Sequence, residues 1–92
     1  MKIPNKIKIL GKTYEVEFQP NYERDEDRHG SHCPNDQKIV IDSSIHREAQ
    51  ESTFIHELLE AIKFQLDIKL EHTDLCALES TIYQIVKDND IF

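Results

Sequence analysis

Three short runs of the chain predict strands, and in the first two of them apolar and polar residues alternate with period two, which is the pattern of half-buried strands. The first two runs, Lys6–Leu10 and Thr13–Phe18, are separated by Gly11-Lys12, so a β-hairpin with a tight turn is predicted. The third run, Lys38–Asp42, predicts another strand. The residues expected on the buried faces of these strands are Ile7, Ile9, Tyr14, Val16, Phe18, Ile39 and Ile41.

The second half of the chain changes to the helical period of 3.6 residues. A long helix is predicted from about His46 or Arg47 to Leu66, with its apolar stripe centred on Ile55. A second helix follows a cap at Thr73 or Asp74 and runs to about Lys87, on a stripe of its own. Because the loop between the two helices is short, we expect them to pack roughly antiparallel and to cover the sheet.

The segment Asn21–Asp36 is polar and charged, and it predicts a long loop. Such a loop either closes over a cleft or is a loose surface connection. The predicted fold is therefore α+β: a small antiparallel sheet, made of the hairpin plus one strand, packed by two helices in a single domain over residues 1–92.

Composition excludes several classes of function. The formal charge is −7, from 11 Lys and Arg against 18 Asp and Glu, which argues against a general nucleic-acid binder. Neither a signal-peptide core nor a long apolar run is seen, so we expect a cytoplasmic protein that does not insert into membranes. Two cysteines, Cys33 and Cys76, lack the spacing of a disulfide framework and fit reduced thiols.

The long helix carries the most chemically suggestive motif, His56-Glu57-Leu58-Leu59-Glu60. On a helical projection, His56 and Glu60 lie within about 40° of each other on the edge of the apolar stripe. This His-Glu-x-x-Glu order differs by one residue from the His-Glu-x-x-His zinc-peptidase motif. His56 and Glu60 are thus candidate metal ligands, and Glu57 is placed like the general base.

A third ligand has to come from outside this helix, and His72 and Glu79 are the candidates. Glu79 falls on the apolar stripe of the second helix, where a carboxylate needs a metal, a histidine or an arginine as its partner. Two alternatives involve no metal: Glu60 pairs with Lys63 or Lys69, or the acidic and histidine side chains form only a buried polar network. A further cluster in the predicted loop, His29, His32 and Cys33, is interpreted as coincidental.

Several of these segments together resemble a family of very small phage and prophage proteins. The resemblance is carried by Ile41–Ser44, Glu48–Thr53, His56–Ile62, His72 and Ile82–Asn89, and it is weakest over the predicted loop. The family is similar to a minimal zincin, akin to the ImmA/IrrE-type metallopeptidases of mobile elements. It implies a small sheet with an active-site helix and a second helix, and a protein encoded by a phage or prophage and acting in the bacterial cytoplasm.

The resemblance implies roles residue by residue. His56, Glu60 and His72 would be metal ligands and Glu57 the catalytic base. Glu79 is not part of the resemblance, and its place on the second helix makes it a candidate supporting residue of the same site. The implied cofactor is zinc, although Glu60 in the slot of the second histidine shifts the preference toward iron or manganese.

Two functions follow as hypotheses. One is a zinc-dependent endopeptidase that cleaves a protein substrate aligned as an extra strand on Lys38–Asp42. The other is a catalytically inactive zincin-like module that binds a protein partner.

Overall fold

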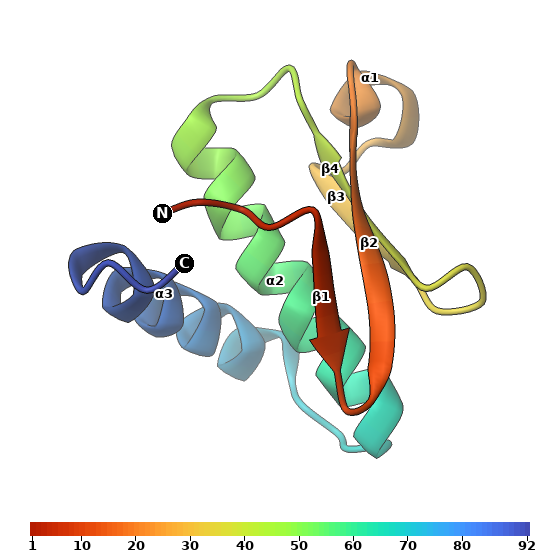
Figure 1. Ribbon diagram of the computed structural model, residues 1–92, viewed down its shortest axis with the longest axis vertical. Coiled ribbons are helices and arrows are strands. Elements are labelled where there is room, and N and C mark those ends of the chain that lie inside the picture. Colours follow the sequence, from red (N-terminus) through yellow and green to blue (C-terminus); the bar gives the residue numbers. More distant parts are fainter.

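The computed structural model describes residues 1–92 and has an α+β fold (Figure 1). Four strands form one sheet: β1 (Lys6–Ile9), β2 (Lys12–Gln19), β3 (Gly30–Cys33) and β4 (Lys38–Asp42). Two long helices, α2 (Arg47–Leu66) and α3 (His72–Asp88), follow the sheet, and a short helix, α1 (Tyr22–Glu26), precedes β3. The hairpin, the β4 strand and both long helices confirm the sequence predictions. The hairpin turn is displaced by one residue, because Ile9 pairs with Lys12 and the turn is Leu10-Gly11, not Gly11-Lys12 as predicted. None of the helices is long and apolar enough to cross a bilayer.

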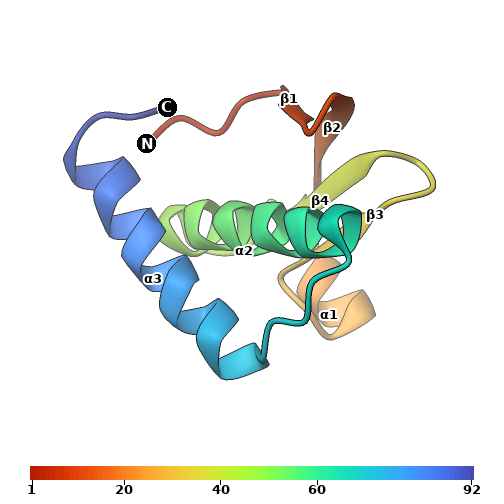
Figure 2. The same ribbon diagram turned by 90° about the horizontal axis from the view of Figure 1, so that it is seen from below.

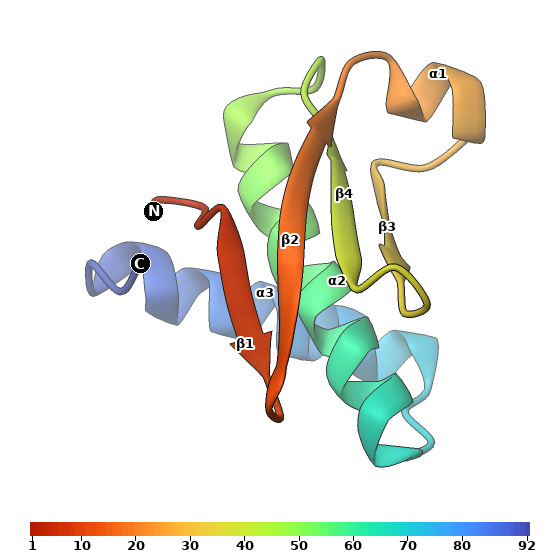
Figure 3. The ribbon, with the colours of Figure 1, turned by 45° about the vertical axis from the view of Figure 1, so that its right-hand side comes forward.

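The sheet differs from the prediction in its order and direction, because its strands run β1-β2-β4-β3 and β2 pairs with β4 in parallel (Figure 3). The sheet is therefore mixed, and the expected all-antiparallel sheet is wrong. The segment predicted to be a loop holds α1 and β3, and it returns the chain so that β4 enters parallel to β2. Since β4 lies between β2 and β3, it is not an edge strand, and the predicted addition of a peptide to Lys38–Asp42 is wrong.

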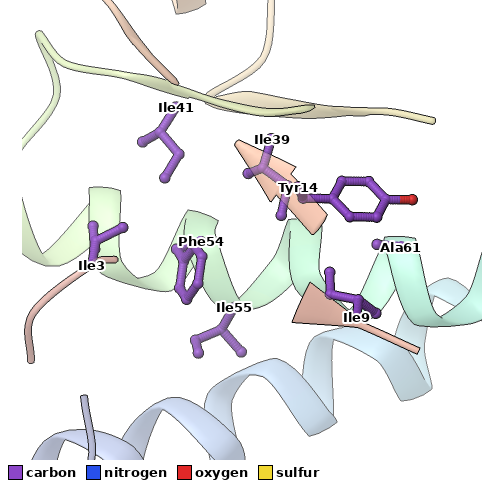
Figure 4. Close-up of a cluster of buried hydrophobic side chains, with 8 residues drawn as sticks. All are labelled: Ile3, Ile9, Tyr14, Ile39, Ile41, Phe54, Ile55 and Ala61. Carbon is purple, nitrogen blue, oxygen red and sulfur yellow. The ribbon is translucent and has the colours of Figure 1, made fainter. Parts of the chain in front are cut away.

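Helix α2 covers one face of the sheet, and α3 crosses α2 obliquely on the side away from the strands, not roughly antiparallel as predicted (Figure 2). The core is made of eight buried side chains around α2, where most lie toward the sheet and Ile55 lies on the side that faces α3 (Figure 4). These residues are Ile3, Ile9, Tyr14, Ile39, Ile41, Phe54, Ile55 and Ala61. Phe18, predicted to be buried, is instead exposed.

Hydrogen bonds between side chains fix α3 on α2. The Tyr83 hydroxyl donates to the buried Glu51 at 2.7 Å, and Lys87 donates to Glu48 at 2.7 Å. Because these contacts join the first half of α2 to the second half of α3, they determine which α3 residues face the middle of α2.

Candidate functional site

The His-Glu-x-x-Glu motif lies in the middle of α2, next to the edge strand β3 and to the first half of α3. Gly30 of β3 packs so closely on α2 that a Cβ atom at this position would lie 2.6 Å from Cγ2 of Thr53 and 2.5 Å from the carbonyl oxygen of Val40. The absence of a side chain at Gly30 thus brings the edge strand down onto the helix one turn before His56.

His56 is held by a residue of the second helix. Its Nδ1 lies 2.7 Å from Oε1 of Glu79, and the Ser52 hydroxyl donates to the other oxygen of Glu79 at 2.9 Å. A carboxylate accepts hydrogen bonds, so Nδ1 carries the hydrogen and Nε2 is the nitrogen left for another partner. The prediction that Glu79 needs a partner is confirmed, because its carboxylate is paired with the ring nitrogen of His56 and the hydroxyl of Ser52.

Glu57 is buried beside His56, with 7% of its surface exposed. Burial raises the pKa of Glu57 to about 7, and the negative charges of Glu60 and Glu79 act in the same direction. His56 and Arg28 oppose this rise in pKa. A carboxyl group with a pKa near neutrality can both accept and return a proton at physiological pH.

Two adjoining hollows, of about 390 and 260 Å³, lie on either side of this point and share Gly30, His56 and Glu57 in their walls. The larger one reaches toward α3 and Glu79, whereas the smaller one reaches along β3 to Glu60 and His32. Together they form a cleft between β3 and α2 with His56 and Glu57 at its centre.

The remaining predicted ligands lie apart from one another. Glu60 lines the smaller hollow and makes no ion pair with Lys63 or Lys69. His72 is exposed in the first turn of α3, not before the helix as predicted, and its ring centroid is 6.5 Å from that of His56. Its Nε2 lies 3.5 Å from the thiol of Cys76. No three His, Cys, Asp or Glu side chains in the structure converge closely enough to hold a metal ion.

Two residues of the site, Ser52 and Gly30, were not proposed as site residues from the sequence, and a third, His32, was set aside. Ser52 precedes His56 by four residues, so helical spacing could have identified it. His32, interpreted as part of a coincidental cluster, lines the smaller hollow, and its Nε2 lies 3.3 Å from the Tyr14 hydroxyl. Burial lowers the pKa of His32, which the charge of Glu60 partly offsets.

Comparison with known proteins does not assign this site. No protein-family model matches the chain, and neither the curated proteins nor the solved structures searched contain a match.

Proposed function

We propose that the chain is a metal-dependent hydrolase of peptide bonds, with His56 as a metal ligand and Glu57 as the base. The observation that carries the proposal is the juxtaposition of an oriented histidine and a buried carboxyl group of pKa about 7 at the centre of one cleft. Glu57 would take a proton from a water molecule in the cleft and deliver it to the departing amine.

The free edge of β3 supports an extended peptide as the substrate. The amide of Asp42 donates to the carbonyl oxygen of His29 at 2.8 Å, and the register places Ser31 opposite Val40. Because hydrogen-bonded positions alternate along an antiparallel pair, the backbone groups of Gly30 and His32 point outward. A peptide bonded to them would lie over His56 and Glu57.

The chemical types of the available donors suit zinc, but their present positions do not. Imidazole and carboxylate are both zinc ligands, and His56, Glu60 and His72 would hold the ion. When bound there, zinc would supply an acidified water molecule and polarise the peptide carbonyl group. Since these side chains do not converge in the structure, metal binding requires them to move.

The test combines metal content with cleavage of a fluorogenic peptide library. We expect about one zinc per chain in the parent, loss of the metal in His56→Ala, and retention of the metal in Glu57→Gln with a fall in cleavage of about 10²-fold or more. Glu26→Gln, an equivalent change on the exposed helix α1, is the matched control. Cleavage by Glu57→Gln at the parent rate would contradict the role given to Glu57.

The dispersed ligands favour a second candidate, a zincin-like module that binds a peptide in the same cleft without cleaving it. This candidate predicts a partner of unchanged mass in the complex, and binding that is insensitive to chelators. Fragments of the partner that disappear when a chelator is added would exclude it.

A further inference from the structure

A separate hollow of about 350 Å³ lies at the other edge of the sheet, between β1 and the second half of α2. It is almost wholly apolar, in contrast to the polar cleft at β3. Its walls are Ile7, Lys8, Ile9, Leu10, Leu58, Ile62 and Leu66. Leu10 and Leu66 stand at its rim with 59% and 51% of their surfaces exposed. Grouped exposed apolar residues of this kind mark interaction sites more often than isolated ones do.

The hairpin turn holds Leu10 in a strained conformation. Both turn residues have positive φ angles, 50° at Leu10 and 86° at Gly11, which is the type I′ geometry of two-residue hairpins. Asparagine or glycine is favoured at the first position, and leucine is strained there. The turn therefore carries a large, exposed apolar side chain at a position where a smaller residue would be less strained, and this side chain lines the hollow.

Strand β1 has an open edge beside this hollow. The amide of Val16 donates to the carbonyl oxygen of Asn5 at 2.8 Å, and Ile7 lies opposite Tyr14. By the alternation of antiparallel hydrogen bonds, the backbone groups of Lys6 and Lys8 point away from β2. The edge therefore offers donors and acceptors to one further strand, and Figure 3 shows β1 as an outermost strand of the sheet.

The charge at this edge is opposite to that of the whole chain. Lys2, Lys6, Lys8 and Lys12 are all exposed, although the chain carries a formal charge of −7. On its inner side β1 already pairs with a strand of alternating acidic and apolar residues, since Lys6 lies opposite Glu15 of β2. A segment with the same alternation would place apolar side chains in the hollow and carboxylates beside Lys6 and Lys8.

We propose that the β1 edge docks an extended segment of a partner protein in which apolar and acidic residues alternate. The segment adds to β1 as a fifth strand, with its apolar side chains between Leu10 and Leu66. This surface is separate from the cleft at β3 and does not depend on the function proposed there.

The experiment uses two synthetic eight-residue peptides, one of alternating valine and glutamate and one of alternating valine and lysine. Amide chemical shifts of the isotope-labelled protein are followed as each peptide is added. We expect the glutamate peptide to shift residues 6–10 and 58–66 and to bind about ten-fold more tightly than the lysine peptide. Equal binding of the two peptides, no binding of the glutamate peptide, or shifts centred on β3 would overturn the proposal.

Two substitutions sharpen the result. Lys8 lies opposite Thr13, so Lys8→Glu places no like charge directly opposite itself in the hairpin, and it should weaken binding of the glutamate peptide about two- to five-fold. Arg24→Glu on the exposed helix α1 is the control for net charge. Leu66→Ala should also weaken binding, whereas Leu78→Ala, an exposed leucine of α3 outside the hollow, should not. Concentration-dependent shifts of residues 6–10 without peptide would make a second copy of the chain the occupant and refute the acidic partner.

Discussion

Glu57 gives this fold a pH dependence that one nearly isosteric substitution should remove. The pKa of its carboxyl group is raised by burial from the ordinary 4.5 to about 7 in the folded chain. Between these pH values the folded state keeps the proton while the unfolded state has lost it. Stability therefore falls as the pH rises through this window, and above about 7 the loss is complete.

The magnitude follows from the same shift. At about 1.36 kcal/mol per pH unit, a rise in pKa from 4.5 to about 7 corresponds to about 3 kcal/mol of unfolding free energy. Glutamine at this position resembles the protonated carboxyl group at every pH. Glu57→Gln should therefore match the parent near pH 4 and exceed its stability by about 3 kcal/mol at pH 8, or more than about 10 °C in Tm for a domain of this size.

Urea unfolding of both proteins at half-unit steps from pH 4 to 8.5, with chelator present, measures this difference. Histidine titrations that are common to the two proteins cancel when one free energy is subtracted from the other. A difference that stays constant across the range would refute the inference that burial of Glu57 controls its pKa. A difference that grows only below pH 4.5 would show that the sign of the shift is wrong.

Other substitutions test the elements that position the site. Gly30→Ala, whose new methyl group would meet atoms 2.5 and 2.6 Å away, should lower the free energy of unfolding by about 1–3 kcal/mol in urea titrations. Glu79→Gln should weaken zinc binding about 10- to 100-fold by calorimetry, because it loosens the bond that orients His56. Tyr83→Phe leaves the buried Glu51 without its 2.7 Å donor and should cost about 1–3 kcal/mol, measured by thermal unfolding.

The parts of the fold that follow from periodicity were predictable. The hairpin has strict alternation and a glycine at its turn, and α2 ends at Leu66 as its apolar pattern predicts. Strand β3 was not predictable, because Gly30–Cys33 has neither the branched nor the aromatic residues that favour strands. It becomes a strand through pairing with β4 and close packing on α2, which are tertiary effects.

The candidate site also has a part that was predictable from the sequence and a part that was not. The place of Glu79 among the buried residues of α3 could be derived from helical spacing, and its need for a partner from the cost of burying a charge. The contact between Glu79 and His56 depends on the crossing of the two helices, which no local pattern specifies. The position of His72 was predicted only in part. The chain reversal between the helices brings its ring near that of His56, as expected, but the side chain is exposed and does not line the cleft.

The two open edges of the sheet present different chemistry to an added strand. At β3, the outward backbone groups lie above buried and partly buried carboxylates, next to a helix held at contact distance by Gly30. At β1, they lie beside lysines and an apolar hollow. Lysines on an edge strand discourage pairing with other strands in general. An acidic segment is favoured over these because its carboxylates neutralise the lysine charges. Since β2 and β4 separate the two edges, Lys8→Glu should alter docking at β1 without changing metal binding or cleavage at β3, and an equal loss of both would mean that the edges do not act independently.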